Sequence, residues 1–463
     1  MAIPLITASF VQMAYNMTDM IWLGHLGSEC VAAVGVAGFY TWLCNSLSFI
    51  GKVGGEVTIS QSLGAKKFKQ ARAYANQAAM LSLIISVTYA LSVFLASPLL
   101  VSLFSLEAHI SDMAVEYMKI VSFGIFFTFN NNTFSGIYNG QGNSRTPLKI
   151  VATGLVTNMI LDPLLIYGLG PVPGMGTAGA GIATTLSQML VFGIFTARLY
   201  WRKSPIGHLR FIVLPRKRFM GRVAALGLPV SMQSGLFAMI GMLLGSMAAT
   251  FGYIGVAVQS IGAQIEAITW MTGAGFSTAL AAFVGQNYGA RNFERIQKGY
   301  RYTLKLALSI AGVATVVFLL FGRQLFRIFV ADDATLDAGR DYMLILAVSQ
   351  LFVSLEAVSA GAFNGCGRTI PPAVTGISLN LLRLPMAWLL MRIPELGMNG
   401  IWISITVSSI LKGVMLRIWY GRFRATGYSY RSTADSGPGN KSKGTILRPF
   451  GKMYAIASRL WQQ

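Results

Sequence analysis

The sequence predicts an all-α polytopic membrane protein of about 12 transmembrane helices in two parallel six-helix repeats. Composition is the first observation: of 463 residues, 54% are hydrophobic and 11% charged. A soluble chain would carry about 25% charged residues. Apolar runs long enough to cross a bilayer recur from end to end, and the second half of the chain repeats the first.

Glycine and charge clusters divide the apolar runs into helices, each with the roughly 20 apolar residues that a bilayer requires. The predicted helices cover residues 2–24, 31–62, 73–101, 115–140, 147–170, 177–201, 221–251, 254–286, 299–330, 338–365, 372–393 and 398–420. The first run lacks a basic segment before it, so no cleavable signal is predicted.

Successive connections alternate in charge. GAKKFKQAR (64–72) and GARNFERIQKGYR (289–301) are basic, whereas SLEAHISDMAVEY (105–117) and VADDATLDAGRDY (330–342) are acidic. The positive-inside rule places the basic connections and both termini in the cytoplasm, with the chain in the inner (cytoplasmic) membrane. Arg323 and Arg327 run against this rule. The net charge of +21 follows from this topology, and no nucleic-acid partner is expected.

The repeat is visible when each residue is aligned with the residue 225 positions later, so that Gly64 meets Gly289. SQSLGAKKFKQA (60–71) then matches GQNYGARNFERI (285–296). An even number of helices per half makes the repeats parallel, with a substrate cleft expected between them. The predicted domains are an amino-terminal lobe (1–201), a cytoplasmic basic linker (202–220), a carboxyl-terminal lobe (221–420) and a cytoplasmic basic tail (421–463).

Acidic residues inside apolar segments are the candidate functional groups. Of the 16 Asp and Glu residues, those within predicted helices at membrane depth are Asp19, Glu56, Asp162, Glu266 and Glu356. Each costs about 2.5–3.5 kcal/mol at a helix centre, so this number indicates function rather than chance.

NMILDPLLIYG (158–168) holds the strongest candidate site. Asn158 and Asp162 are four residues apart and share a helix face. Pro163 has no N–H, which frees the carbonyl of Met159. These hard oxygen donors suit a small cation. Asp19 is expected at a similar depth, and two neighbouring carboxylates in a low dielectric cannot both stay ionised without a cation. The alternatives are a hydrogen-bonded kink for Asp162 and interhelical packing for Asn158.

Three further sets of residues remain open between structure and function. Lys52 and Glu56 form a second i, i+4 couple, which either neutralises itself or tunes an acid of the same lobe. Glu266 and Glu356 could contact a cationic substrate or a second ion. Arg383 could instead pair with one of these two acids, which would make that acid structural.

The residues that enzymes use are sparse and scattered. Cys30, Cys44 and Cys366 form no CxxC pair, so neither a disulfide framework nor a zinc site is indicated. None of His25, His109 and His208 adjoins an intramembrane acid in sequence, which argues against a membrane hydrolase or acyltransferase. The protein is therefore not expected to be an enzyme.

Four motifs together carry a resemblance to a known family: AIPLITASFVQMAYNMTDMIWLGHLG (2–27), ISQSLGAKKFKQA (59–71), GIYNGQGNSRTP (136–147) and NMILDPLLIYGLG (158–170). The chain resembles the MATE (multidrug and toxic compound extrusion) transporters, in the prokaryotic branch related to the DNA-damage-inducible F proteins. The resemblance implies two lobes in a V shape, alternating between outward-open and inward-open states. It also implies a secondary active antiporter that exports organic cations in exchange for inward H⁺ or Na⁺.

The resemblance also implies which residues form the coupling site. The family's coupling site corresponds to Asp19, Asn158, Asp162 and Thr184, with Thr185 close to the last of these positions. The carboxyl-lobe acids of another MATE branch have no clean counterpart, and Gln233 stands in the helix where an acid is expected.

The expected partners are small organic cations and membrane lipids, with no cofactor beyond the coupling ion, and the chain is expected to be a monomer. Protons are favoured over sodium as that ion. The alternative is a lipid-linked sugar or oligosaccharide flippase of the same superfamily. Such a protein needs several arginines for pyrophosphate, whereas most intramembrane charges here are acidic, which favours cations.

Overall fold

The structure is a computed structural model that describes residues 3–7, 10–11, 22–23, 25–104, 106–169, 172–201, 208–210 and 213–428. The chain divides into one compact unit, residues 1–421, and a second segment, residues 422–463. Most of the first predicted helix, including Asp19, lies outside the described residues, as do parts of the predicted linker and most of the predicted tail.

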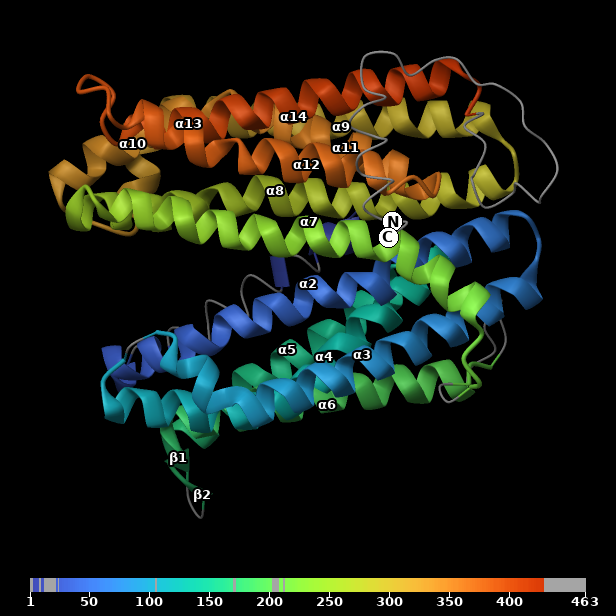
Figure 1. Ribbon diagram of the computed structural model, residues 1–463, viewed down its shortest axis with the longest axis horizontal. Coiled ribbons are helices and arrows are strands. Elements are labelled where there is room, and N and C mark those ends of the chain that lie inside the picture. The colour runs from blue at the N-terminus through green and yellow to red at the C-terminus, as the bar shows by residue number, and fades with distance from the viewer. Residues whose placement is uncertain are drawn as a thin grey trace. The chain divides into compact units, whose positions relative to one another are not determined.

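The first half contains five described helices and a short antiparallel hairpin (Figure 1). Their bounds are α2 Ser28–Gly64, α3 Phe68–Ser102, α4 Ala108–Gly140, α5 Arg145–Ile166, β1 Gly168–Leu169, β2 Val172–Pro173 and α6 Gly176–Trp201. Within this half α4 packs against α2, α3 and α6, and α5 packs on α6.

The second half contains α7 Lys217–Ala249, α8 Gly252–Gly289, α9 Phe293–Arg327, α10 Asp333–Ala347, α11 Ser349–Gly365, α12 Ile370–Leu381, α13 Arg383–Leu390 and α14 Asn399–Ala425. Among the described residues, nine helices are long and apolar enough to cross a membrane, and α10 with α11 makes ten if that bent pair counts as one span. The prediction of an all-α polytopic membrane protein is confirmed.

A bend of 46° divides the predicted helix 338–365 into α10 and α11. At this bend, side chains donate hydrogen bonds to backbone carbonyls. Ser349 Oγ and Gln350 Nε2 donate to the carbonyl of Leu346 at 2.7 and 3.1 Å, and Thr315 Oγ1 donates to that of Ala347 at 2.9 Å. Side chains inserted into a helical hydrogen-bond ladder are a general cause of such bends.

The two halves share their turns as well as their helices. Lys66 and Arg291, 225 positions apart, both follow a Gly-Ala pair and both have φ 58°. Gly142 and Gly367, again 225 apart, have φ 84° and 73°. The turns use the same hydrogen bonds, because Gly142 N donates to Asn139 O and Gly367 N donates to Asn364 O, each at 2.8 Å. The internal repeat therefore extends to backbone conformation.

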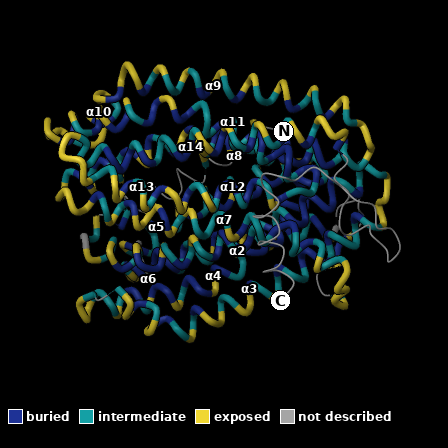
Figure 2. The backbone as a smooth tube through the Cα atoms, turned by 45° about the horizontal axis from the view of Figure 1, so that its top comes forward, coloured by how far each residue is buried: buried dark blue, intermediate teal, exposed yellow. Residues whose placement is uncertain are grey.

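Each half has its own apolar core, and large apolar side chains also lie on the outside. One cluster gathers Tyr40, Val121 and Phe129 from the first half, and another gathers Tyr342, Leu346 and Trp402 from the second. Exposed positions recur along α9 in Figure 2, where Val313 and Leu320 are each 65% exposed. Exposed apolar residues at this density suit a helix that faces lipid.

The repeats meet mainly through α2, which packs against both α7 and α8 of the second half. Midway along this contact the hydroxyls of Ser46 and Ser234 lie 3.1 Å apart. We call the end of the bundle formed by the connections 64–68, 140–145, 289–293 and 365–370 the basic end, since it carries Lys66, Arg145, Arg291 and Arg368.

Candidate functional site

The centre of the candidate site is a hydrogen bond on α5. Asn158 Nδ2 donates to Asp162 Oδ1 at 3.0 Å, and both side chains are completely buried. The two residues are one turn apart, so the bond forms within the helix. Asn158 Oδ1 is also buried and has no hydrogen-bond partner among the described residues. Pro163 follows within the same helix. The site thus offers a carboxylate and an amide oxygen, side by side and away from water.

Helix α6 covers the face of α5 that carries this pair. Gly154, one turn before Asn158, packs closely against Val191 and the backbone of Ser187. Thr184 lies three residues from Ser187 and therefore on the same face of α6. Because α5 and α6 run antiparallel, this register brings Thr184 toward the level of Asp162.

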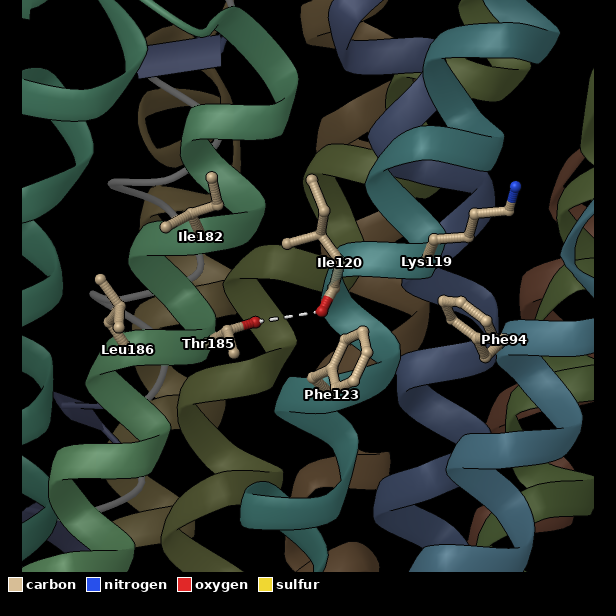
Figure 3. A pocket seen from close by; sticks show the side chains of 7 residues that line it. All are labelled: Phe94, Lys119, Ile120, Phe123, Ile182, Thr185 and Leu186. Carbon is tan, nitrogen blue, oxygen red and sulfur yellow. Dashed lines mark hydrogen bonds between the residues drawn. The ribbon is translucent and has the colours of Figure 1, made fainter. Parts of the chain in front are cut away.

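The neighbouring Thr185 is directed elsewhere. Its hydroxyl donates to the carbonyl of Ile120 on α4 at 3.4 Å, beside a pocket of about 370 Å³ (Figure 3). That pocket is otherwise lined by apolar side chains of α3, α4 and α6, with Lys119 at its edge. Of the two threonines, Thr184 is thus the one on the face toward α5. Asp19 cannot be placed against these residues, since it lies outside the described ones.

In the second half, Glu266 on α8 is held by two neutral donors. Tyr342 Oη donates to Glu266 Oε2 at 3.0 Å, and Gln350 Nε2 donates to Glu266 Oε1 at 2.8 Å. Tyr342 and Gln350 are themselves buried and belong to α10 and α11. This carboxyl therefore joins three helices through hydrogen bonds, without an ion-pair partner within 4 Å among the described residues.

Glu356 on α11 has a different partner. Lys412 Nζ on α14 lies 3.0 Å from Glu356 Oε2, with side chains only 6% and 15% exposed for Lys412 and Glu356. Arg383 on α13 does not bond either acid directly; it donates to the hydroxyls of Ser408 and Ser409 of α14. Sequence reasoning offered Arg383 as the counter-charge and missed Lys412. The signal for Lys412 was present, since a lysine in the apolar run SSILKGVML requires a buried partner.

The remaining candidates lie apart from these pairs. Gln233 on α7 packs against Gly376 of α12. Lys52 and Glu56 share a face of α2, yet no ion pair of 4 Å or less joins these two described side chains. Lys52 Nζ lies 5.3 Å from the centre of the Phe49 ring instead, and Glu56 is 3% exposed with Oε1 unpartnered among the described residues.

A group of amides in α4 escaped the sequence analysis. Asn131 Nδ2 donates to Gln188 Oε1 on α6, and Asn132 Nδ2 donates to Asn45 Oδ1 on α2, both at 3.0 Å. Asn130 Nδ2 donates to Ser86 Oγ on α3, also at 3.0 Å. The run Asn130–Asn132 inside an apolar segment was its sequence signal, because amides at that depth need partners on other helices.

Apolar helices in two parallel repeats, with carboxylates buried against amides and a lysine, define a class of membrane protein: the two-repeat helical transporters. Comparison with known proteins identifies the family. The sequence pattern of the MatE family matches residues 4–164 and again residues 229–389. The two matches are 225 residues apart, as are the repeats. The chain belongs to the MatE (MATE) family, whose members are transporters and not enzymes.

The chain is similar to curated relatives along nearly their full length. It is 27% identical over 422 residues to a probable multidrug resistance protein NorM of Thermotoga maritima, covering 91% of this chain and 90% of that protein. It is also 23% identical over 416 residues to a FAD transporter of Shewanella oneidensis, covering 89% and 91%.

Solved structures of transporters have the same fold. An outward-facing multidrug resistance MATE family transporter matches with a TM-score of 0.86 and 26% identity, over 92% of this chain and 94% of that one. A MOP superfamily transporter from Pyrococcus furiosus, described as having a binding pocket of reverse polarity, matches with a TM-score of 0.85 and 26% identity, over 93% and 95%.

Proposed function

We propose that this transporter is a multidrug antiporter that exports small organic cations in exchange for inward H⁺ or Na⁺, by alternating access of its two repeats. The proposal rests chiefly on the completely buried Asn158–Asp162 pair in a membrane-spanning helix. A carboxylate at this depth is tolerated when a cation or proton can neutralise it. Its charge can then change as the repeats rearrange.

Asp19, Asn158, Asp162 and Thr184 form the coupling site in this proposal. A proton would bind a carboxylate directly. For Na⁺, the Asp162 carboxylate and the Asn158 amide oxygen are hard donors of the required kind. Asn158 Oδ1 has no partner among the described residues and suits such a ligand, because a buried acceptor without a donor is unfavourable. Protons remain the favoured ion, and no other cofactor enters the proposal.

The names of relatives support the substrate class, since several are called probable multidrug resistance proteins. Glu266 would attract cationic substrates from the second half, and Gln233 would supply a neutral contact, whereas Glu356, paired with Lys412, would have a structural role. The basic end would face the cytoplasm, with both termini there and the chain in the inner membrane. Membrane lipids would be its surroundings, and the monomer its working unit.

The alternative, a flippase for lipid-linked sugars, would use basic side chains to hold pyrophosphate. The described part of the second half contains two buried bases, but both have partners: Lys412 is 3.0 Å from Glu356, and Arg383 donates to Ser408 and Ser409. Cation export therefore fits the charges better.

The test is transport of ethidium or norfloxacin in everted vesicles, with Na⁺ and pH gradients imposed separately. Asp162→Asn keeps the shape of the site but cannot exchange a proton or neutralise Na⁺. We expect gradient-driven transport to be lost while the protein is still inserted at the normal level.

The matched control is Asp112→Asn, which changes an exposed acid of α4 and should transport normally. The same vesicles distinguish the two ions, since one gradient drives transport and the other does not. Normal gradient-driven transport by Asp162→Asn would remove the proposed coupling site. Transport of lipid-linked sugars but of neither cation would favour the flippase.

A further inference from the structure

At the basic end the two repeats are joined by a reciprocal pair of hydrogen bonds. Gln61 Nε2 on α2 donates to the carbonyl of Gly365 at 2.8 Å, and Gln286 Nε2 on α8 donates to that of Gly140 at 3.2 Å. Donors and acceptors are each 225 positions apart, so every bond is the repeat image of the other. Both acceptors end a helix, where carbonyls lack intrahelical partners. We call these four residues the glutamine clasp.

The backbones around the clasp approach one another closely. A Cβ on Gly64 would collide with the carbonyl oxygen of Gln286, and a Cβ on Gly289 would collide with that of Gln61. One turn earlier, Gly285 of α8 leaves room for the Ser60 hydroxyl of α2. The basic end is therefore closed by direct contact between the first and second repeats.

Glu56 lies on the part of α2 that this contact covers. Ser60, one turn further on, occupies the same helix face and packs against Gly285 of the other repeat. The backbone of Glu56 lies against Gly140, whose carbonyl belongs to the clasp. The side chain is only 3% exposed. Separation of α2 from α8 would bring water to this carboxyl group.

The surroundings of Glu56 suit a neutral carboxyl group. Among the described residues, Lys52 of the same helix is the charged side chain that acts on it electrostatically. Next to Glu56, the neighbouring helices meet α2 through residues that do not titrate: Ala78 of α3 lies against Gly55, Gly140 of α4 against the Glu56 backbone, Val223 of α7 against Gly54, and Gly285 of α8 against Ser60.

Among the described residues, buried acceptors without a donor occur on both helices that meet at the contact between Glu56 and Gly140. Glu56 Oε1 and the Oδ1 of Asn139, which adjoins Gly140, are both buried and unpartnered among the described residues. A protonated carboxyl group has an O–H to donate in such a place, whereas an ionised one would be a buried, unpaired charge.

The repeat shows that packing does not require an acid at this position. Ala281 stands 225 residues after Glu56, at the equivalent place in α8, and is 5% exposed. A small apolar residue fills the same position in the second repeat. Close packing of the helices at this position therefore does not need the carboxyl group of Glu56.

We propose that Glu56 is a proton-carrying latch: closure of the glutamine clasp requires its proton-bound form, and opening releases that proton to water at the basic end. The latch is separate from the Asp162 site. With the orientation proposed above, the proton would enter the cytoplasm, but the test below depends neither on that orientation nor on transport.

The test measures a distance across the clasp at different pH. Spin labels are placed at Lys69→Cys and Glu294→Cys, two exposed, repeat-equivalent positions, after the three native cysteines are replaced by serine. Double electron–electron resonance is recorded in lipid nanodiscs without substrate, from about pH 5 to about pH 8. We expect a short-distance population at low pH and a growing long-distance population as pH rises, with the ratio changing by up to about tenfold per pH unit.

Substitutions then identify the responsible group. Glu56→Gln, which keeps the size of the side chain and is always neutral, should hold the short distance at every pH. Asp162→Asn should keep the pH response. Gln61→Leu combined with Gln286→Leu should give the long distance throughout. The latch is overturned if the unaltered protein shows no pH response, or if Glu56→Gln retains the response. Loss of antiport in transport assays would leave these distance changes intact, so the two proposals fail separately.

Discussion

At the scale of single residues, the buried acids are each stabilised in a different way. Asp162 accepts a hydrogen bond from an amide of its own helix, whereas Glu266 accepts bonds from a tyrosine and an amide on two other helices. Glu356 is instead paired with Lys412. The two donors to Glu266 are neutral, so they leave the charge of that carboxylate uncompensated. An acid paired with a lysine is already neutralised and serves the architecture better.

This difference predicts a structural role for the Glu356–Lys412 pair. Either Glu356→Gln or Lys412→Met alone leaves a charge buried without its partner, and we expect a loss of about 3–5 kcal/mol in stability. The double variant removes both charges and should recover most of that loss. Thermal unfolding in detergent, followed for the two single variants and the double variant, measures the coupling.

The control is the pair Glu294–Lys298, 2.7 Å apart but with side chains 78% and 66% exposed. Replacing either residue of this pair should change the stability of the protein little, because water screens an exposed pair. Additive losses in the Glu356–Lys412 double variant would show that the pair is not coupled.

The sequence revealed the part of the candidate site that lies within one helix. The spacing of Asn158 and Asp162 predicts a shared face, and their hydrogen bond has that geometry. The contacts of Glu356 and Glu266 lie on other helices, 56 and 84 residues away along the chain in the cases of Lys412 and Gln350. Helical periodicity says which face a residue occupies but not which helix covers that face, so these partners could not be predicted.

At the scale of elements, the helices continue beyond the apolar runs that predict them. The helix predicted from residue 73 begins at Phe68, and the one predicted from residue 299 begins at Phe293. Charged residues mark where the bilayer ends, but nothing at that point stops the backbone hydrogen bonds of a helix. Helix ends are set instead by turns, such as the one at Lys66 with its positive φ.

One helix start depends on a titratable side chain. Asp332 caps α10, because its Oδ2 accepts from Thr335 N at 3.0 Å and from Thr335 Oγ1 at 2.8 Å. These hydrogen bonds hold the pKa of Asp332 below its ordinary value. Since the pKa is lower in the folded protein, the stabilisation is present above the unfolded value of about 3.9 and is lost as pH falls through the folded one.

We therefore expect Asp332→Ala to lower the unfolding temperature in detergent at neutral pH. The difference from the unaltered protein should shrink once the pH falls below the folded pKa of Asp332, where the unaltered side chain is also protonated. A difference that stays constant across this range would show that the carboxylate charge is not what stabilises the helix start.

At the scale of the whole molecule, the repeat was the strongest prediction that the sequence allowed. The alignment of Gly64 with Gly289 places these residues at equivalent turns, and the structure has the same turn at both. The alignment cannot say which surfaces of the repeats touch, because two similar halves can meet through many faces. The contact between α2 and α8 could therefore be identified only from the structure.

That contact predicts what an added methyl group would do. In Gly64→Ala combined with Gly289→Ala, each new Cβ would collide with the carbonyl oxygen of the opposite clasp glutamine, so the basic end should no longer close.

Cys366 adjoins the clasp residue Gly365 and is 4% exposed, so its reactivity reports whether the basic end is closed. With Cys30 and Cys44 changed to serine, a polar maleimide in detergent should label Cys366 faster in this variant. The control is Gly38→Ala on α2, where a Cβ would meet nothing within 4 Å. Labelling no faster than in that control would mean that the basic end still closes with the methyl groups present, which contradicts the close contact described there.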